Sequence, residues 1–352
     1  MDLYTLNELI ATIETIIVPK THFLDKYFKI EHRSDKPEIF FDEVFKGQVM
    51  LAPFVIPTAA GKPQNRESYK TKSFAPSYLK PLDHIRPGDV QTRRAGEPFG
   101  GALTAMDRME LAVLDALYRQ KLQITQRWEW LAQMALIDGA VTIVGEDYPS
   151  TLVDFGRSAD NTVVISLSTD QWSDVDHDIK DDLEDWSGVG AEQCGTPLTD
   201  VYMSREIWSY FKKNNSIKEE IDLTVRNVST ISTSPTADDP TNPVVFKGYV
   251  GEFAIYVHNG TYRDPVDNLT KRYLASDEVL MVAPVGVTGT EGVYGVRGFG
   301  MIEDKKAELQ ALPVFPRVYE QPNPSMDVAM TQSAPLMIPG RPNGTMKITG
   351  VI

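Results

Sequence analysis

The apolar positions are most regular between residues 104 and 138, where their spacing predicts one long helix. Eight of them recur on a single helical face, namely Met106, Met109, Val113, Leu117, Ile124, Trp128, Leu131 and Ala135. Thr104 and Asp107 have the spacing of a capping box, and Gly139 offers a left-handed stop. Such a helix would extend roughly 50 Å. This length favours a structural spine over a compact catalytic domain.

Short β-prone runs on the C-terminal side of this helix predict a mixed α+β fold. Residues 141–144 and 151–155 predict a hairpin, and strands are expected over 250–258 and 279–287. The remaining expected elements are helices over 176–186, 204–213 and 216–226, an exposed loop over 229–243 and an extended apolar tail over 328–338. No repeat of fixed period occurs, which argues against a solenoid or a propeller.

Two extended runs precede the long helix, over residues 48–56 and 67–74. Turn-forming residues such as Pro57 and Gly61 join them, so the pattern predicts a long hairpin. Large apolar side chains are scarce after Ile56, and a two-stranded hairpin has little core of its own. The hairpin is therefore either a mobile surface loop or an arm that lies on another subunit.

The overall charge restricts the partners of the chain. A formal net charge of -14 argues against sequence-specific DNA binding, because phosphate neutralisation supplies much of such affinity. A wall that encloses DNA without holding it is compatible with this charge. Cys194 is the only cysteine, which excludes an internal disulfide and fits a reducing cytoplasm. The chain shows no secretory leader and no long apolar run, so we expect no contact with a membrane.

The charge is unevenly distributed along the chain. Residues 62–94 contain eight basic and three acidic residues, a net charge of +5. Residues 170–192 contain nine acidic residues and one basic residue, a net charge of -8. Segments of opposite charge attract each other, so they are candidates for a mutual contact.

Sequence motifs of enzymes are missing. The chain has no Walker A sequence, no Gly-x-Ser-x-Gly, no His-Glu-x-x-His and no Cys-x-x-Cys, and its five histidines lie far apart. Residues 295–300 are rich in glycine, but their spacing differs from the dinucleotide fingerprint, so we interpret them as turns between strands. We therefore expect neither an enzyme nor a cofactor.

The acidic segment contains one candidate metal site. Its residues fit positions one, three, five, seven, nine and twelve of an EF-hand loop, in the order Asp174, Asp176, Asp178, Lys180, Asp182 and Asp185. Ile179 occupies the position that requires glycine, and Asp185 stands where a longer Glu normally binds. An acidic helix start capped by Ser173 is the simpler interpretation. A soluble metal-dependent hydrolase remains an alternative.

Four stretches in order along the chain resemble the major capsid proteins of lambda-like tailed phages, which share the Hong Kong 97 phage capsid fold. They are FAPSYLKP at 74–81, GRS at 156–158, GEFAIYV at 251–257 and MTQSAPLM at 330–337. Together they extend over most of the chain.

The resemblance implies a division of the chain into five parts. These would be an N-terminal arm over 1–47, an extended loop (the E-loop) over 48–88, a peripheral domain with the spine helix over 89–160, an axial domain over 161–319, and a C-terminal segment over 320–352 that returns to the peripheral domain.

The resemblance also implies a function. Copies would form hexamers and pentamers of an icosahedral head that encloses double-stranded DNA, through a procapsid that expands. Scaffolding protein, portal and a decoration protein are the implied partners, and assembly would occur in the host cytoplasm before the chain becomes part of the virion. An encapsulin-like compartment shell of the same fold is the alternative.

From the charge pattern and the resemblance we derive one residue-level hypothesis. The basic loop, with Lys62, Arg66, Lys70 and Lys72, lies across an acidic surface of a neighbouring subunit that includes Asp181, Asp182 and Asp185. Exposed ion pairs contribute about 1 kcal/mol or less each and are screened by salt, so they would guide register more than hold subunits together.

Overall fold

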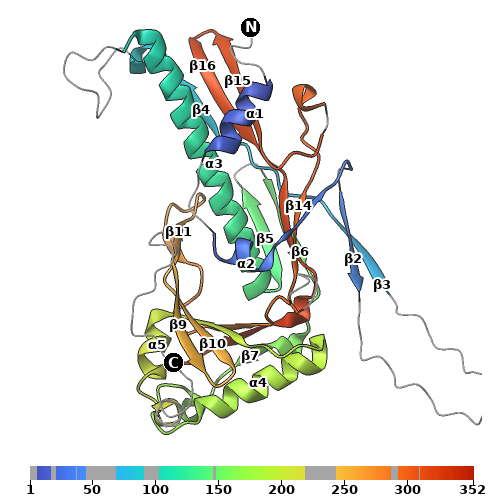
Figure 1. Ribbon diagram of the computed structural model, residues 1–352, viewed down its shortest axis with the longest axis vertical. Coiled ribbons are helices and arrows are strands. Elements are labelled where there is room, and N and C mark those ends of the chain that lie inside the picture. Colours follow the sequence, from blue (N-terminus) through green and yellow to red (C-terminus); the bar gives the residue numbers. More distant parts are fainter. Residues whose placement is uncertain are drawn as a thin grey trace, which may run out of the picture.

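The computed structural model describes residues 6–16, 21–36, 38–44, 69–90, 103–145, 148–218, 243–286, 292–308 and 310–352. Within these ranges the chain forms an elongated molecule, with helix α3 (Ala105–Ile137) along its length and a six-stranded sheet at one end (Figure 1). Helices and sheets are mixed, so the predicted α+β class is confirmed. In the described part of the chain, no helix is both long enough and apolar enough to cross a membrane.

Helix α3 begins and ends where the sequence predicts. The Thr104 hydroxyl accepts a hydrogen bond from the Asp107 N–H at 3.2 Å, and the Asp107 carboxylate accepts one from the Thr104 N–H at 2.8 Å. This capping box satisfies two backbone donors at the start of the helix. At the other end Gly139 has φ 65°, and a Cβ there would lie 2.8 Å from the Cβ of Arg157. Glycine is therefore required at that position.

Two three-stranded sheets lie along α3. The first consists of β15 (Phe315–Pro322), β16 (Ser325–Gln332) and β4 (Leu82–Ile85), and the second of β1 (Ile30–Arg33), β14 (Gly295–Phe299) and β17 (Pro335–Pro339). Helix α1 (Leu6–Thr15) contacts both β15 and α3 beside the first sheet (Figure 1). The predicted extended tail is thus two strands, β16 and β17, that belong to different sheets.

The glycine-rich segment 295–300 was predicted to form turns. In the structure it contains β14, the central strand of the second sheet. Its glycines make room for side chains from other segments. A Cβ at position 295 would collide with the ring of Phe28, and one at position 298 would lie 3.0 Å from Ile39. Close packing explains these glycines, and the interpretation as turns was wrong.

The six-stranded sheet has the strand order β7-β18-β13-β8-β10-β9. Its strands are β7 (Thr162–Val164), β18 (Thr345–Thr349), β13 (Val279–Val282), β8 (Asp200–Met203), β10 (Phe253–His258) and β9 (Val244–Val250). Strand β18 comes from the C-terminal segment that was expected to return to the peripheral domain. Conversely, β14 and most of β15 fall within the range expected for the axial domain but lie along α3.

Helices of the acidic region differ from their predicted bounds. Helix α4 is Ile179–Cys194, so it starts three residues later and ends eight residues later than predicted. Asp178, and not Ser173, is its N-cap, because the Asp178 carboxylate accepts hydrogen bonds from the N–H groups of Lys180 and Asp181. Helix α5 (Arg205–Phe211) matches its prediction. Most of the helix predicted over 216–226 lies outside the described residues.

One predicted strand is in fact a hairpin. Residues 250–258 contain the end of β9, a turn in which Gly251 has φ 57°, and then β10. Glycine adopts this left-handed backbone readily, so Gly251 allows a tight turn between the two strands. Strand β13 was predicted correctly but is shorter than 279–287.

Three two-stranded sheets complete the fold. They are β5 (Ala140–Gly145) with β6 (Tyr148–Asp154), β2 (Ile39–Val44) with β3 (Tyr69–Phe74), and β11 (Thr261–Arg263) with β12 (Thr270–Arg272). The first confirms a predicted hairpin. The short helical elements are α2 (Phe23–Tyr27), η1 (Pro87–Val90), η2 (Ala159–Asn161), η3 (Ser168–Asp170), η4 (Lys305–Ala307) and η5 (Pro342–Gly344). The predicted loop 229–243 lies outside the described residues except for its last residue.

Gln120 is a fully buried polar residue that joins α3 to its neighbouring sheet. Its amide nitrogen donates to the carboxylate of Asp83 and to the carbonyl of Ala329, both at 2.9 Å, and its amide oxygen accepts from the Thr331 hydroxyl at 2.6 Å. Replacing it (Gln120→Leu) would leave the buried Ala329 and Thr331 groups without this partner. We expect the free energy of unfolding to fall by about 3 kcal/mol in urea titrations of the unassembled chain.

The matched control is Gln126→Leu, an exposed glutamine on the same helix. It should change the free energy of unfolding by less than about 0.5 kcal/mol. Equal effects of the two substitutions would contradict the role assigned to Gln120.

Candidate assembly surfaces

The β2–β3 ribbon, defined as those two strands, projects from the body of the molecule (Figure 1). Lys70 pairs with Glu43 and Lys72 with Phe41 in its antiparallel register. Two of the predicted contact residues, Lys62 and Arg66, and the predicted strand 48–56 lie outside the described residues. The described partner of β3 is β2, which lies in the range predicted for the N-terminal arm.

The predicted acidic partner surface lies on the first turns of α4. Asp181 and Asp185 are exposed. Asp182 is engaged within the chain, because its carboxylate accepts a hydrogen bond from the Trp172 indole N–H at 2.9 Å and lies 2.7 Å from the His177 ring nitrogen. Of the three predicted carboxylates, therefore, two are available to a partner and one stabilises its own fold.

The other carboxylates at the predicted EF-hand positions also form hydrogen bonds within the chain. Asp174 accepts a hydrogen bond from the Asp176 N–H, Asp176 accepts one from the Asn215 side chain, and Asp178 caps α4. Among the residues that the structure describes, no group of three His, Cys, Asp or Glu side chains has the arrangement of a metal site. The thiol of Cys194 is buried at the end of α4, and burial raises its pKa.

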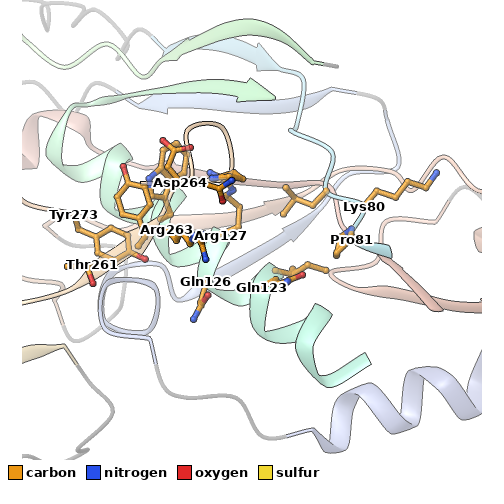
Figure 2. Close-up of a pocket in the computed structure, with 15 residues that line it drawn as sticks. Lys80, Pro81, Gln123, Gln126, Arg127, Thr261, Arg263, Asp264 and Tyr273 are labelled. Carbon is orange, nitrogen blue, oxygen red and sulfur yellow. The ribbon is translucent and has the colours of Figure 1, made fainter. Parts of the chain in front are cut away.

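A groove runs between α3 and the β11–β12 hairpin (Figure 2). Its cavity measures about 760 Å³, and Gln123, Gln126 and Arg127 of α3 line it opposite Thr261 and Tyr273. A second cavity of about 560 Å³ shares Arg127 and several other lining residues with the first. The space is therefore elongated, and it suits an extended segment better than a compact ligand.

Two residues in the groove have unused hydrogen-bonding groups. The Arg127 guanidinium stacks 4.8 Å from the centre of the Trp130 ring and has no hydrogen bond to any residue that the structure describes. Burial lowers the pKa of Arg127, and the charge of Asp264 opposes this shift. The indole N–H of Trp130 is buried without an acceptor. A segment that brings carbonyl or carboxylate oxygens into the groove would supply acceptors for the Arg127 guanidinium.

Helix α2 connects α3 to the six-stranded sheet through a buried polar network that we call the clasp. It consists of Lys26 and Tyr27 of α2, Glu129 of α3, and Asp200 and Tyr202 of β8. The Glu129 carboxylate accepts hydrogen bonds from the N–H groups of Phe23 and Leu24, both at 2.9 Å. The network therefore starts at the N-terminus of α2, where an anion is favoured.

The other members of the clasp reach the sheet. The Tyr27 hydroxyl donates to Asp200 at 2.6 Å, and the Lys26 ammonium forms a 2.8 Å ion pair with the same carboxylate. Burial raises the pKa of Glu129, and its backbone hydrogen bonds oppose that shift. Burial also lowers the pKa of Lys26, against the charge of Asp200. Buried charges with this many partners fix the relative position of α3 and the sheet.

Sequence reasoning did not identify Glu129, Arg127 or Trp130 as more than residues of a long helix. The residues that Glu129 and Trp130 contact across the fold, such as Phe23 and Tyr262, lie more than one hundred positions away in the sequence. The one sequence signal for a buried polar site was Glu129, a charged residue next to Trp128 of the apolar stripe.

A family model for phage major capsid protein E matches residues 5–350. The major capsid protein of Escherichia phage lambda is 25% identical over 347 residues, which cover 97% of this chain and 98% of that protein. The major capsid protein of Escherichia phage N15 is 26% identical with the same coverage. Among solved structures, a prophage capsid protein from E. coli CFT073 matches with a TM-score of 0.72, at 21% identity and 99% coverage of both chains.

Two histidines beside the clasp, the half-buried His22 and the buried His258, should make stability depend on pH. Burial lowers the pKa of His258 to about 4, and burial together with the charge of Lys26 lowers that of His22 to about 3. His22 faces Tyr202, and the ring of His258 faces Phe23, Tyr273 and the Gly260 N–H.

Both histidine pKa values lie below the ordinary value of about 6.5, so between pH 6.5 and 4 the unfolded chain binds more protons than the folded chain. The free energy of unfolding should therefore be highest above pH 6.5 and should decrease as the pH is lowered. His258→Asn, which keeps an acceptor but does not titrate, should reduce the loss of unfolding free energy between pH 7 and pH 5 by about 1.5 kcal/mol. Urea titrations at the two pH values measure this difference.

His84→Asn, at an exposed position, is the control and should leave the difference between the two pH values unchanged. The assignment of His258 fails if its variant loses as much stability on acidification as the wild-type chain.

Proposed function

The chain belongs to the phage major capsid protein E family, and from this premise we propose how its copies build the shell of a phage head. It is a major capsid protein of the lambda-like type, and many copies of it form the virion shell. Its fold is the Hong Kong 97 phage capsid fold. The observation that carries the assignment is the family match over almost the whole chain, together with a solved structure of a prophage capsid protein that has the same fold.

The finer architecture is an icosahedral head of hexamers and pentamers that encloses double-stranded DNA. Copies first assemble in the host cytoplasm as a procapsid around scaffolding protein, with a portal, and the shell then expands and takes up a decoration protein. A net charge of -14 supports enclosure of DNA without sequence-specific binding. The family match favours this container over an encapsulin-like compartment. Four of the carboxylates proposed for a metal-dependent hydrolase, those of Asp174, Asp176, Asp178 and Asp182, are engaged in local contacts, which disfavours that alternative.

Within the subunit, α3 is the spine of the peripheral domain, and the six-stranded sheet with α4 and α5 is the axial domain. The β2–β3 ribbon is the base of the E-loop. Because β1 and α2 pack into the body, the N-terminal arm ends earlier than residue 47.

The ribbon contacts a neighbouring subunit. Its projection from the body supports this, since a two-stranded ribbon needs a further surface to be stable. Lys70 and Lys72 on the ribbon are complementary in charge to the exposed Asp181 and Asp185 of α4 on the next copy. The groove along α3 is a second surface for a neighbour, because the Arg127 guanidinium that lines it can donate to oxygen acceptors of a docked segment.

The function itself is tested by expressing the chain together with scaffolding protein. Closed shells in electron micrographs are the expected product, and they should sediment far ahead of single capsomers. A chain that remains a small oligomer in size-exclusion chromatography under these conditions would contradict the assignment.

The ribbon contact is tested by charge reversal. The double variant Lys70→Glu with Lys72→Glu should lower the yield of particles several-fold without lowering the free energy of unfolding of the subunit. Each ion pair contributes little free energy, but the same pairs recur at every subunit of the shell, so the losses of binding free energy add up over the whole assembly. Particle yield from density gradients, compared with urea titration of the subunit, measures both effects.

Lys29→Glu with Lys305→Glu makes the same change in net charge at two exposed positions elsewhere and is the control. Adding Asp181→Lys and Asp185→Lys to the ribbon variant should restore the yield, because the charges are then exchanged. An unchanged yield in the ribbon variant would reject the contact, and a failed restoration would reject α4 as its partner.

A further inference from the structure

The two outer strands of the six-stranded sheet, β9 and β7, each pair on one side alone among the described residues. Open edges of this kind are a template for association, and monomeric proteins usually cover or charge them. Here both edges instead carry exposed apolar side chains. Tyr249 of β9 is 54% exposed, and Val164 of β7 is 67% exposed.

At the β9 edge the exposed residues continue an aromatic layer that starts in the core. The ring of buried Tyr202 stacks on Tyr256 at 4.8 Å, Tyr256 contacts Phe246 at 5.2 Å, and Phe246 contacts Tyr249 at 5.1 Å. Exposure increases along this series from 0% at Tyr202 to 54% at Tyr249. Helix α2 covers the inner end of the layer, whereas the outer end has no comparable cover from the described part of the chain.

At the β7 edge the corresponding residues are aliphatic. Val164 ends the strand, and Leu167 follows it with 63% of its surface exposed. Isolated apolar residues on a surface are ordinary, but two such residues beside an open strand edge form a patch.

The register of the sheet places the patches on the same face. Phe246 pairs with Tyr256, which pairs with Tyr202, and this row continues through Leu280 and Lys347 to Thr162. Residues in one such row share a face, and so do residues two apart on a strand. Tyr249 is opposite Ala254, two residues from Tyr256, and Val164 is two residues from Thr162. Both patches therefore face the side of α2 and α3, at opposite edges of the sheet.

We propose that the β9 edge of one subunit packs against the β7 edge of the next, with Phe246 and Tyr249 against Val164 and Leu167. This inference rests on the proposed function. A closed ring of identical subunits is built from head-to-tail contacts, in which each copy presents two different complementary surfaces to its two neighbours. Two apolar edges at opposite ends of one sheet, facing the same way, meet this requirement. The occupant of each edge is therefore a second copy of this chain.

The charges beside the two edges support the pairing. Lys247 lies in β9, between the two exposed aromatic residues. The exposed Asp160 and Asp170 lie on either side of β7. Opposite charges around a small apolar contact fix its register more than they strengthen it.

Cross-linking inside assembled shells tests the contact. In a Cys194→Ala background, the double variant Tyr249→Cys with Val164→Cys is assembled and treated with a short bis-maleimide. A head-to-tail contact joins position 249 of one copy to position 164 of the next, so a ladder from dimer to hexamer is expected in denaturing gels. Each single variant should remain monomeric, because its cysteine faces no second cysteine.

A mixture of the two single variants should give dimers and nothing larger, since each chain then has one reactive thiol. The mixture also tests the contact if the double variant does not assemble. Phe246→Cys with Leu167→Cys is a second, independent pair for the same experiment. Intact shells without cross-links in either pair would overturn this inference and leave the proposed function standing. Dimers from a single variant would overturn it as well, because the contact would then be symmetric. Failure of the unmodified chain to form shells would reject the proposed function instead.

Discussion

The buried carboxylate of Glu129 constrains the rest of the structure, because a buried charge is tolerated only when its surroundings satisfy it. Glu129 accepts the first N–H groups of α2, and α2 in turn delivers Tyr27 and Lys26 to Asp200 on β8. Helix α3 and the six-stranded sheet are thereby held in one relative position. The contacts proposed for the ribbon, the groove and the sheet edges all depend on this geometry, since each surface belongs to one of the two bodies that the clasp joins.

The elements that could be predicted from the sequence are those whose signals are local. Helix α3 was placed to within one residue at each end because its apolar stripe, the Thr104–Asp107 box and Gly139 all lie within the helix or beside it. The β5–β6 hairpin was found for the same reason. By contrast, β14 was mistaken for turns, because glycine in a sequence does not distinguish a turn from a site where another segment packs closely. The rings and side chains that require Gly295 and Gly298 come from residues more than two hundred positions away.

The candidate surfaces follow the same division. A run of acidic residues indicated where an acidic surface lies, and Asp181 and Asp185 are indeed exposed on α4. The sequence does not indicate which of these carboxylates is bound within the chain. This depends on the tertiary structure, in which the Trp172 and His177 side chains both contact Asp182. The groove and the aromatic edge could not be derived at all. Each forms only when strands and helices far apart in the sequence are brought together, as Arg127 and Tyr273 are at the groove.

An assembling subunit requires a fold that keeps its own shape and surfaces that another copy can contact. Inside the subunit, Gln120 joins α3 to β16, and the clasp joins α3 to the six-stranded sheet, so hydrogen bonds within one chain hold these elements in place. Outside, an aromatic layer extends to an open strand edge, and a groove retains donors without acceptors. A single contact at such a site is weak. Four apolar side chains or one ion pair contribute little free energy of association once the entropy cost of association is subtracted. Weakness is an advantage in a shell, since misplaced subunits can dissociate while a closed ring holds every copy at two edges at once. The open edges that would endanger a monomer are thus tolerable in a chain whose stable state is a closed assembly.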